Sequence, residues 1–225
     1  MTIKKLLFYL LAGFLSSCIP VMSLRPLYTK EDTTFEDNLI GTWVNDSNET
    51  TWQFKRINEP PKAYELIFSD AEGNKGFFVI HLVKLESRFF LDVYPSESPC
   101  GQLNDPNEAK WPYNKFFLIP AHTFVKIEAF EPQLRLRLTD DEGMKNLLKE
   151  YPNAVKHETV EDYNGSILLT ASTKELKEFV LRFSNDSRLF TDEIVLTLQK
   201  AKITSEPNCI TPNETEPNST EPNKN

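Results

Sequence analysis

Short segments in which apolar and polar residues alternate dominate the chain from about residue 40 onward. A period of two is typical of strands with one buried face. This pattern predicts strands at 40–44, 51–55, 64–68, 88–94, 123–129, 134–138, 167–171 and 194–198. Residues 77–85 are instead apolar on both faces, which indicates a central strand that is covered on each side.

A link of two residues, Glu86-Ser87, would join 77–85 to 88–94 as a hairpin. In that register His81 lies opposite Asp92. The strands 123–129 and 134–138 form a second predicted hairpin. Shifting their pairing by one residue would move one set of apolar side chains to the other face, so only one alignment brings both sets together. The expected pairs are Val125 with Leu138, Ile127 with Leu136, Ala129 with Leu134 and, on the outer face, Glu128 with Arg135.

Two helices interrupt the strand pattern, near 141–150 and 172–184. Asp140 or Asp141 can cap the first helix, which ends before Pro152. Ser172-Thr173-Lys174-Glu175 is a capping box for the second. Each helix has one apolar face, made by Met144, Leu147 and Leu148 in the first and by Leu176, Phe179, Val180 and Phe183 in the second.

The start of the chain has the parts of an export signal. Lys4 and Lys5 precede an apolar stretch at 6–14 that is too short to cross a bilayer as a helix. The run Leu15-Ser16-Ser17-Cys18 resembles the lipobox of bacterial lipoproteins. That resemblance implies cleavage before Cys18 and lipid on its thiol. The alternative is an ordinary cleaved signal followed by a chance cysteine.

These features divide the chain into a signal peptide (1–17), a lipid anchor with a short lead-in (18–39), a β-rich body (40–204) and a tail (205–225). The tail repeats Glu-Pro-Asn and has too few apolar residues to bury a core, so it is expected to be disordered. Once Cys18 carries lipid, Cys100 and Cys209 remain. They could form a disulfide in an oxidising compartment, or they could stay separate thiols.

Loss of residues 1–17 removes two lysines and changes the formal charge from −8 to −10. An acidic body is a poor partner for nucleic acid or for an anionic lipid surface. It suits a domain that does not lie flat on the bilayer. Ile19 follows the cysteine, which by analogy with lipoproteins indicates the outer membrane, facing the periplasm, or the cell surface.

Gly41-Thr42-Trp43 resembles the Gly-x-Trp that opens the first barrel strand of lipocalins, where the tryptophan packs at the closed end. The fold prediction is therefore mainly β with two helices (α+β), as a curved antiparallel sheet or a small lipocalin-like barrel. The chain departs from lipocalins in its two helices and in lacking a late arginine to stack on Trp43. Residues 24–43, 120–124 and 167–179 resemble segments of uncharacterised bacterial envelope proteins, which implies no activity.

The usual motifs of nucleophilic, phosphate-binding and zinc-dependent enzymes are absent from the sequence. The His81–Asp92 pair is the one low-priority catalytic candidate, since a carboxylate can orient an imidazole as a general base. The simpler interpretation is a buried polar pair inside a sheet. No metal or cofactor is predicted.

The leading hypothesis is a non-enzymatic, lipid-anchored envelope protein that binds another envelope component. The alternative is a carrier of a small apolar ligand in a lipocalin-like cavity, and an enzyme built on His81 and Asp92 ranks third.

Overall fold

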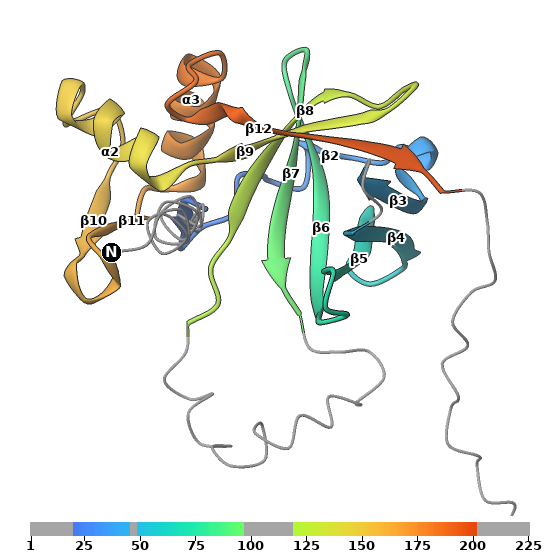
Figure 1. Ribbon diagram of the computed structural model, residues 1–225. Helices are drawn as coiled ribbons and strands as arrows, with labels where there is room; N and C mark the ends of the chain where they lie inside the picture. The colour runs from blue at the N-terminus through green and yellow to red at the C-terminus, as the bar shows by residue number, and fades with distance from the viewer. Residues whose placement is uncertain (1–19, 46–48, 97–118, 202–225) are drawn as a thin grey trace, which may run out of the picture.

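The computed structural model describes residues 20–45, 49–96 and 119–201 (Figure 1). The strands are β1 (Met22–Ser23), β2 (Thr33–Thr34), β3 (Gly41–Asn45), β4 (Thr51–Ile57), β5 (Ala63–Ser69), β6 (Lys75–Leu85), β7 (Arg88–Pro95), β8 (Thr123–Ala129), β9 (Leu134–Thr139), β10 (His157–Val160), β11 (Ser166–Leu169) and β12 (Phe190–Lys200). The helices are α2 (Asp141–Glu150) and α3 (Thr173–Phe183), with short 3₁₀ turns η1 (Asp37–Leu39) and η4 (Glu161–Tyr163).

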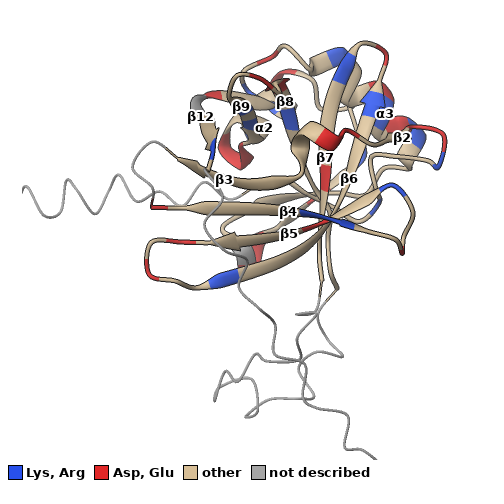
Figure 2. Cartoon of the chain, turned by 90° about the vertical axis from the view of Figure 1, so that its right-hand side faces the viewer, with Lys and Arg blue, Asp and Glu red and all other residues tan. Residues whose placement is uncertain are grey.

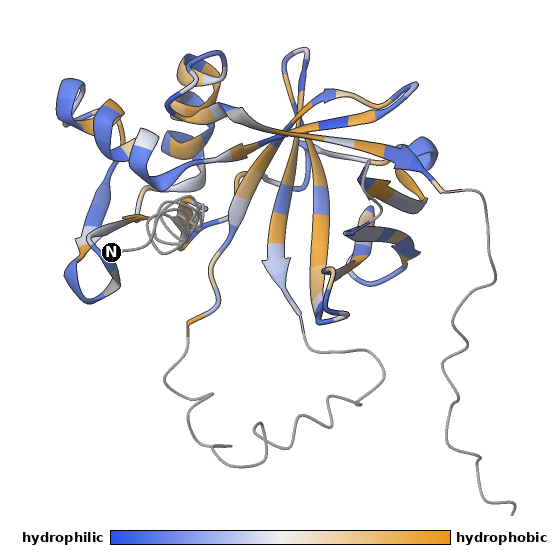
Figure 3. Ribbon diagram, viewed as in Figure 1, coloured by the Kyte–Doolittle hydropathy of each residue, from blue (hydrophilic) through white to orange (hydrophobic). Residues whose placement is uncertain are grey.

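Eight strands form a closed antiparallel barrel in the order β3-β4-β5-β6-β7-β8-β9-β12. Each barrel strand pairs with the barrel strand that comes before it and the one that comes after it in the sequence. The last strand, β12, closes the ring by pairing with β3, with Leu198 opposite Asn45. Orange and blue residues alternate along the barrel strands in Figure 3, as expected when one face points inward. The prediction of a mainly β fold with two helices and a lipocalin-like barrel is confirmed.

The β6–β7 hairpin has the predicted register, with Leu85 opposite Arg88 and His81 opposite Asp92. Glu86 supports the two-residue turn in a left-handed conformation at φ 55°. No glycine in the sequence marks this turn, so its main signal was the short link of two residues between the two apolar segments.

The β8–β9 hairpin follows the prediction only in part. Val125 pairs with Leu138 and Ile127 with Leu136, as expected, but Ala129 pairs with Arg135 instead of Leu134. A bulge between Ile127 and Ala129 shifts the register by one residue. The predicted Glu128–Arg135 pair is therefore wrong.

The carboxylate of Glu128 instead contacts Lys126 Nζ at 2.9 Å and Arg137 Nε at 3.0 Å. These contacts join neighbouring positions on the outer face of β8 and β9. The bulge thus redirects an ion pair without changing which face of the hairpin is apolar.

Two hydrophobic cores lie on opposite sides of the barrel wall. The inner core fills the barrel and comprises Leu39, Trp43, Phe54, Tyr64, Leu66, Ile80, Leu82, Leu91, Val93, Val125, Ile127, Leu134, Leu136 and Leu198. An eight-stranded barrel is just wide enough for its own side chains to fill. Leu39, in the 3₁₀ turn η1, is fully buried in this core, so the turn that precedes β3 helps to close one end.

The outer core lies between one side of the barrel and the two helices (Figure 1). It combines outward-facing barrel residues such as Val83, Phe90 and Phe124 with the apolar faces of α2 and α3. Asp140 caps α2, and a complete capping box at Ser172 and Glu175 starts α3. Both predicted helices are confirmed.

The chain between residues 20 and 35, here called the N-terminal strap, belongs to the folded body. Its β1 pairs in parallel with β11, and its β2 pairs with β6. Val21 and Leu27 are fully buried in the outer core. The prediction of a lead-in that extends to residue 39 is therefore wrong, because this segment covers an apolar area of the barrel wall that would otherwise face water.

Candidate functional site

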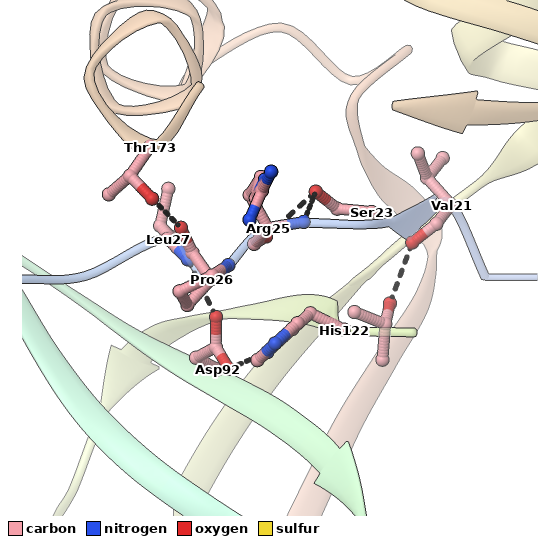
Figure 4. A network of polar contacts seen from close by, with 9 residues as sticks. Val21, Ser23, Arg25, Pro26, Leu27, Asp92, His122 and Thr173 are labelled. Carbon is pink, nitrogen blue, oxygen red and sulfur yellow. Dashed lines mark hydrogen bonds and ion pairs between the residues drawn. The ribbon is translucent and has the colours of Figure 1, made fainter. Parts of the chain in front are cut away.

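Five residues with polar side chains meet where the strap crosses the outer face of β6, β7 and β8. Figure 4 shows two of them, Asp92 and His122, beside the strap. This strap cluster consists of Tyr28, His81, Asp92, Tyr94 and His122. His81 lies on β6, Asp92 and Tyr94 lie on β7, and His122 directly precedes β8. The strap contributes Tyr28. The cluster contains the one pair of residues that the sequence offered as a catalytic candidate.

Asp92 is the centre of the strap cluster. Its side chain is fully buried, and Oδ2 accepts a hydrogen bond of 2.7 Å from the backbone N–H of Leu27. Oδ1 lies 2.6 Å from Nδ1 of His122. A buried carboxylate requires such partners, and here one is on the strap and the other is beside β8.

His81 lies opposite its predicted partner, Asp92, across the β6–β7 ladder. Its ring stacks on Tyr28 with centroids 4.2 Å apart, and 6% of the residue is exposed. Burial lowers the pKa of His81, and His122 adds to this effect, while the negative charge of Asp92 opposes it. Burial together with Asp92 raises the pKa of Tyr28 to about 12. The ring of His81 is therefore expected to be neutral near pH 7.

His122 joins the strap to β8 through its backbone and its side chain. Its N–H donates to Ser23 O and its carbonyl accepts from Ser23 N, both at 2.8 Å. Its ring packs on Tyr94 with centroids 4.6 Å apart, and 14% of its side chain is exposed. Sequence reasoning did not single out His122, because its partner Asp92 is 30 residues away and on another strand.

The strap cluster fits a structural role, in which Asp92 holds the strap against the barrel, better than a catalytic role. His81 and Asp92 are cross-strand neighbours as predicted, yet both are buried, whereas a general base must reach its substrate. The carboxylate of Asp92 is already occupied by Leu27 and His122. These contacts favour the interpretation of a satisfied, buried polar group that holds the strap in place.

The segments 24–43, 120–124 and 167–179 meet beside the strap. Besides the Ser23–His122 bridge, Leu24 N donates to Leu169 O at 3.0 Å. Thr173 Oγ1, at the start of α3, donates to Pro26 O at 2.9 Å. The strap thus contacts segments that lie more than 90 residues away from it in the chain.

Trp43 lies in the inner core, as expected, and is 2% exposed. Its indole N–H donates to Leu39 O at 2.9 Å. The sequence offered no late arginine for this ring, but Lys200 at the end of β12 places Nζ 5.4 Å from the ring centroid. A cation from β12, the last barrel strand, therefore covers the tryptophan of β3, the first barrel strand. Sequence reasoning missed this contact because the cation is lysine rather than arginine.

A pocket of about 350 Å³ lies on the outside of the molecule, between the tips of the β6–β7 and β8–β9 hairpins. Phe89 and Phe130 form part of its wall and pack edge to face at 5.2 Å. Lys126 also lines it, with Nζ 3.5 Å from Oδ1 of Asn185. We call this the hairpin pocket; it combines an apolar surface with charged groups at its rim.

The predicted lipidation site Cys18, the candidate disulfide partners Cys100 and Cys209, and the tail from residue 202 onward lie outside the described residues. Within the described part of the chain, no helix combines the length and the apolar character needed to cross a membrane. The same described ranges hold no group of three or more side chains placed to bind a metal ion.

Comparison of the chain with protein-family models, with curated proteins and with solved structures finds no match. The assignment of a function therefore depends on the sequence motifs and on the geometry described above.

Proposed function

We propose that this protein is a non-enzymatic, lipid-anchored envelope protein that holds a small, filled barrel at a membrane surface and binds another envelope component. The anchor is lipid on Cys18, at the end of the lipobox-like run Leu15-Ser16-Ser17-Cys18. The observation that carries the proposal is how soon after Cys18 the chain becomes part of the folded body. Val21, three residues after Cys18, is fully buried.

Two further observations support a binding role. The side chains inside the barrel pack into one core, which leaves the outer surface as the place where a partner would bind. The buried carboxylate of Asp92 holds the strap, so the pair once considered for catalysis has a structural explanation. An acidic body disfavours nucleic acid as the partner.

The anchor is tested in a bacterial host by metabolic labelling with a palmitate analogue and by membrane fractionation. The intact chain should carry label and sediment with membranes, whereas Cys18→Ser should lose the label and leave the membrane fraction. Because Cys18 precedes the strap, thermal unfolding of the body should be unchanged in the released variant. A Cys18→Ser protein that is still labelled would contradict the proposal.

The binding role is tested by cross-linking in intact cells that express the full chain. A specific product with one envelope component, lost when Cys18→Ser removes the protein from the membrane, is expected. Cross-linking that yields only products also formed by an unrelated lipoprotein would argue against a specific partner.

A second candidate is the carriage of a small ligand, which the hairpin pocket favours, since pockets of 300–1,000 Å³ are typical for such molecules. Carriage predicts that native mass spectrometry of the purified protein finds a bound mass, which is lost in Phe130→Ala. Phe68→Ala, at a half-buried aromatic outside this pocket, is the matched control. Protein without bound mass would leave partner binding as the better proposal.

A further inference from the structure

We infer that Leu24 and Ile119 form the surface that touches the lipid bilayer, with Arg25 at its edge, so that the anchored barrel is held in one orientation. This bilayer contact patch rests on the proposed lipid anchor at Cys18 and goes beyond it. An anchor alone tells where the protein is held, whereas the patch tells which side of the barrel faces the membrane.

The first argument is the shortness of the tether. Three residue steps separate Cys18 from Val21, a reach of about 10 Å in an extended chain. Val21 is hydrogen-bonded on both sides: its N–H donates to Thr139 Oγ1 at 3.1 Å, and its carbonyl accepts from Thr123 Oγ1 at 2.9 Å. Lipid on Cys18 would therefore hold the folded body directly against the membrane surface.

The second argument is where apolar side chains are exposed. Among the described residues, the exposed large hydrophobic side chains are Leu24, at 40%, and Ile119, at 78%. Both lie next to the start of the body, because the Ser23–His122 bridge places the segment that carries Leu24 beside the segment that begins at Ile119. Exposed apolar residues confined to the attachment side are suited to the interfacial region of a bilayer.

The third argument is rigidity. Leu24 N is bound to Leu169 O, and the next residues of the strap are fixed by Thr173 and by the buried carboxylate of Asp92. The part of the patch that carries Leu24 is thus held by contacts to β7, β11 and α3, and Figure 4 shows those to Asp92 on β7 and to Thr173 on α3. A rigid patch gives the barrel a defined tilt, which a flexible linker would not.

Charge limits how much of the molecule can approach the lipid. Acidic and basic residues occupy the turns and helices around the barrel (Figure 2), and the mature chain has a formal charge of −10. An anionic leaflet repels such a body, so contact is confined to the small apolar patch. The exposed guanidinium of Arg25 can meet a lipid phosphate at its edge.

The experiment uses the intact lipidated protein in vesicles that contain a phospholipid with a photoreactive acyl chain. After illumination, labelled peptides are identified by mass spectrometry, and membrane association is measured on the same sample. Labelling is expected to concentrate in residues 19–26 and 119–122. The double variant Leu24→Ser, Ile119→Ser should lower it at least threefold in these peptides while the protein stays membrane-bound.

Ser87→Leu is the matched control, because Ser87 is exposed at the end of β7 opposite the end that neighbours Ile119. An added leucine there should gain no label. Membrane-bound protein that is labelled evenly, or mainly near Ser87, would overturn the contact patch while leaving the anchor intact. Protein that does not associate with vesicles at all would instead contradict the proposed function.

Discussion

At the scale of single residues, Asp92 needs hydrogen-bonding partners because its side chain is buried away from water. It is a fully buried carboxylate whose two oxygens serve different partners, the Leu27 amide and the His122 ring. The sequence indicated its position opposite His81, but not its main role. That role depends on a backbone N–H of the strap, and a hydrogen bond to a backbone group leaves no trace in residue identity.

Asp92→Ala should lower the free energy of unfolding by about 3 kcal/mol, because it leaves a buried N–H and a partly buried imidazole without their acceptor. Chemical denaturation of the chain in solution measures this change. Asp192→Ala is the matched control: its carboxylate is 61% exposed and pairs with Arg137, so it should cost less than about 1 kcal/mol. Equal effects of the two substitutions would show that Asp92 does not fasten the strap.

The lowered pKa of His81 predicts a dependence of stability on pH. Below the ordinary value of 6.5 the unfolded chain binds a proton that the folded chain resists, so the free energy of unfolding falls as the pH drops below 6.5. In His81→Phe, which keeps an aromatic ring against Tyr28, this part of the decrease should disappear. Denaturation curves between pH 7.5 and 5.5 test it, with His157→Gln as the histidine control.

At the scale of elements, the hairpins and helices are where sequence patterns were most informative. The two-residue link Glu86-Ser87 gave the β6–β7 register, and a capping box gave the start of α3. The bulge in β8–β9 was not foreseen, since one extra residue changes the pairing without breaking the apolar pattern. The pattern of side chains thus predicted which residues face the barrel interior, but it did not predict every cross-strand pair of the β8–β9 hairpin.

Ser172→Ala should destabilise the protein by about 1 kcal/mol, because it removes the acceptor for the Glu175 N–H at the start of α3. α3 also holds the strap through Thr173, so the melting temperature of the whole domain should fall. Ser187→Ala, at an exposed position after the helix, should change stability by less than about 0.5 kcal/mol. Thermal unfolding followed by circular dichroism compares the two.

At the scale of the whole molecule, the barrel has a core inside and a second core outside, and the strap completes the second. The strap covers barrel residues such as Val83 and Phe90 and packs near α3. A body that began at residue 40, as the sequence suggested, would leave part of this outer core exposed to water.

A chain that starts at residue 37 should therefore unfold at a clearly lower temperature than one that starts at residue 19, or aggregate on expression. The shorter chain loses two fully buried apolar side chains, Val21 and Leu27, each worth about 2 kcal/mol or more. Soluble yield and thermal melting of the two chains measure the difference. Equal melting temperatures would mean that the strap is not part of the cooperative unit.

The sequence by itself determined the local features of this protein: alternating strands, two capped helices, a tryptophan in the barrel core and the lipobox-like run before Cys18. Each depends on residues close together in the chain, where spacing directly reports periodicity and capping. Only the tertiary structure decided how β12 closes the barrel, how the strap covers its wall and why Asp92 binds His122 rather than His81. These features join segments tens to more than a hundred residues apart, where many partners of the same chemistry compete, and packing selects among them.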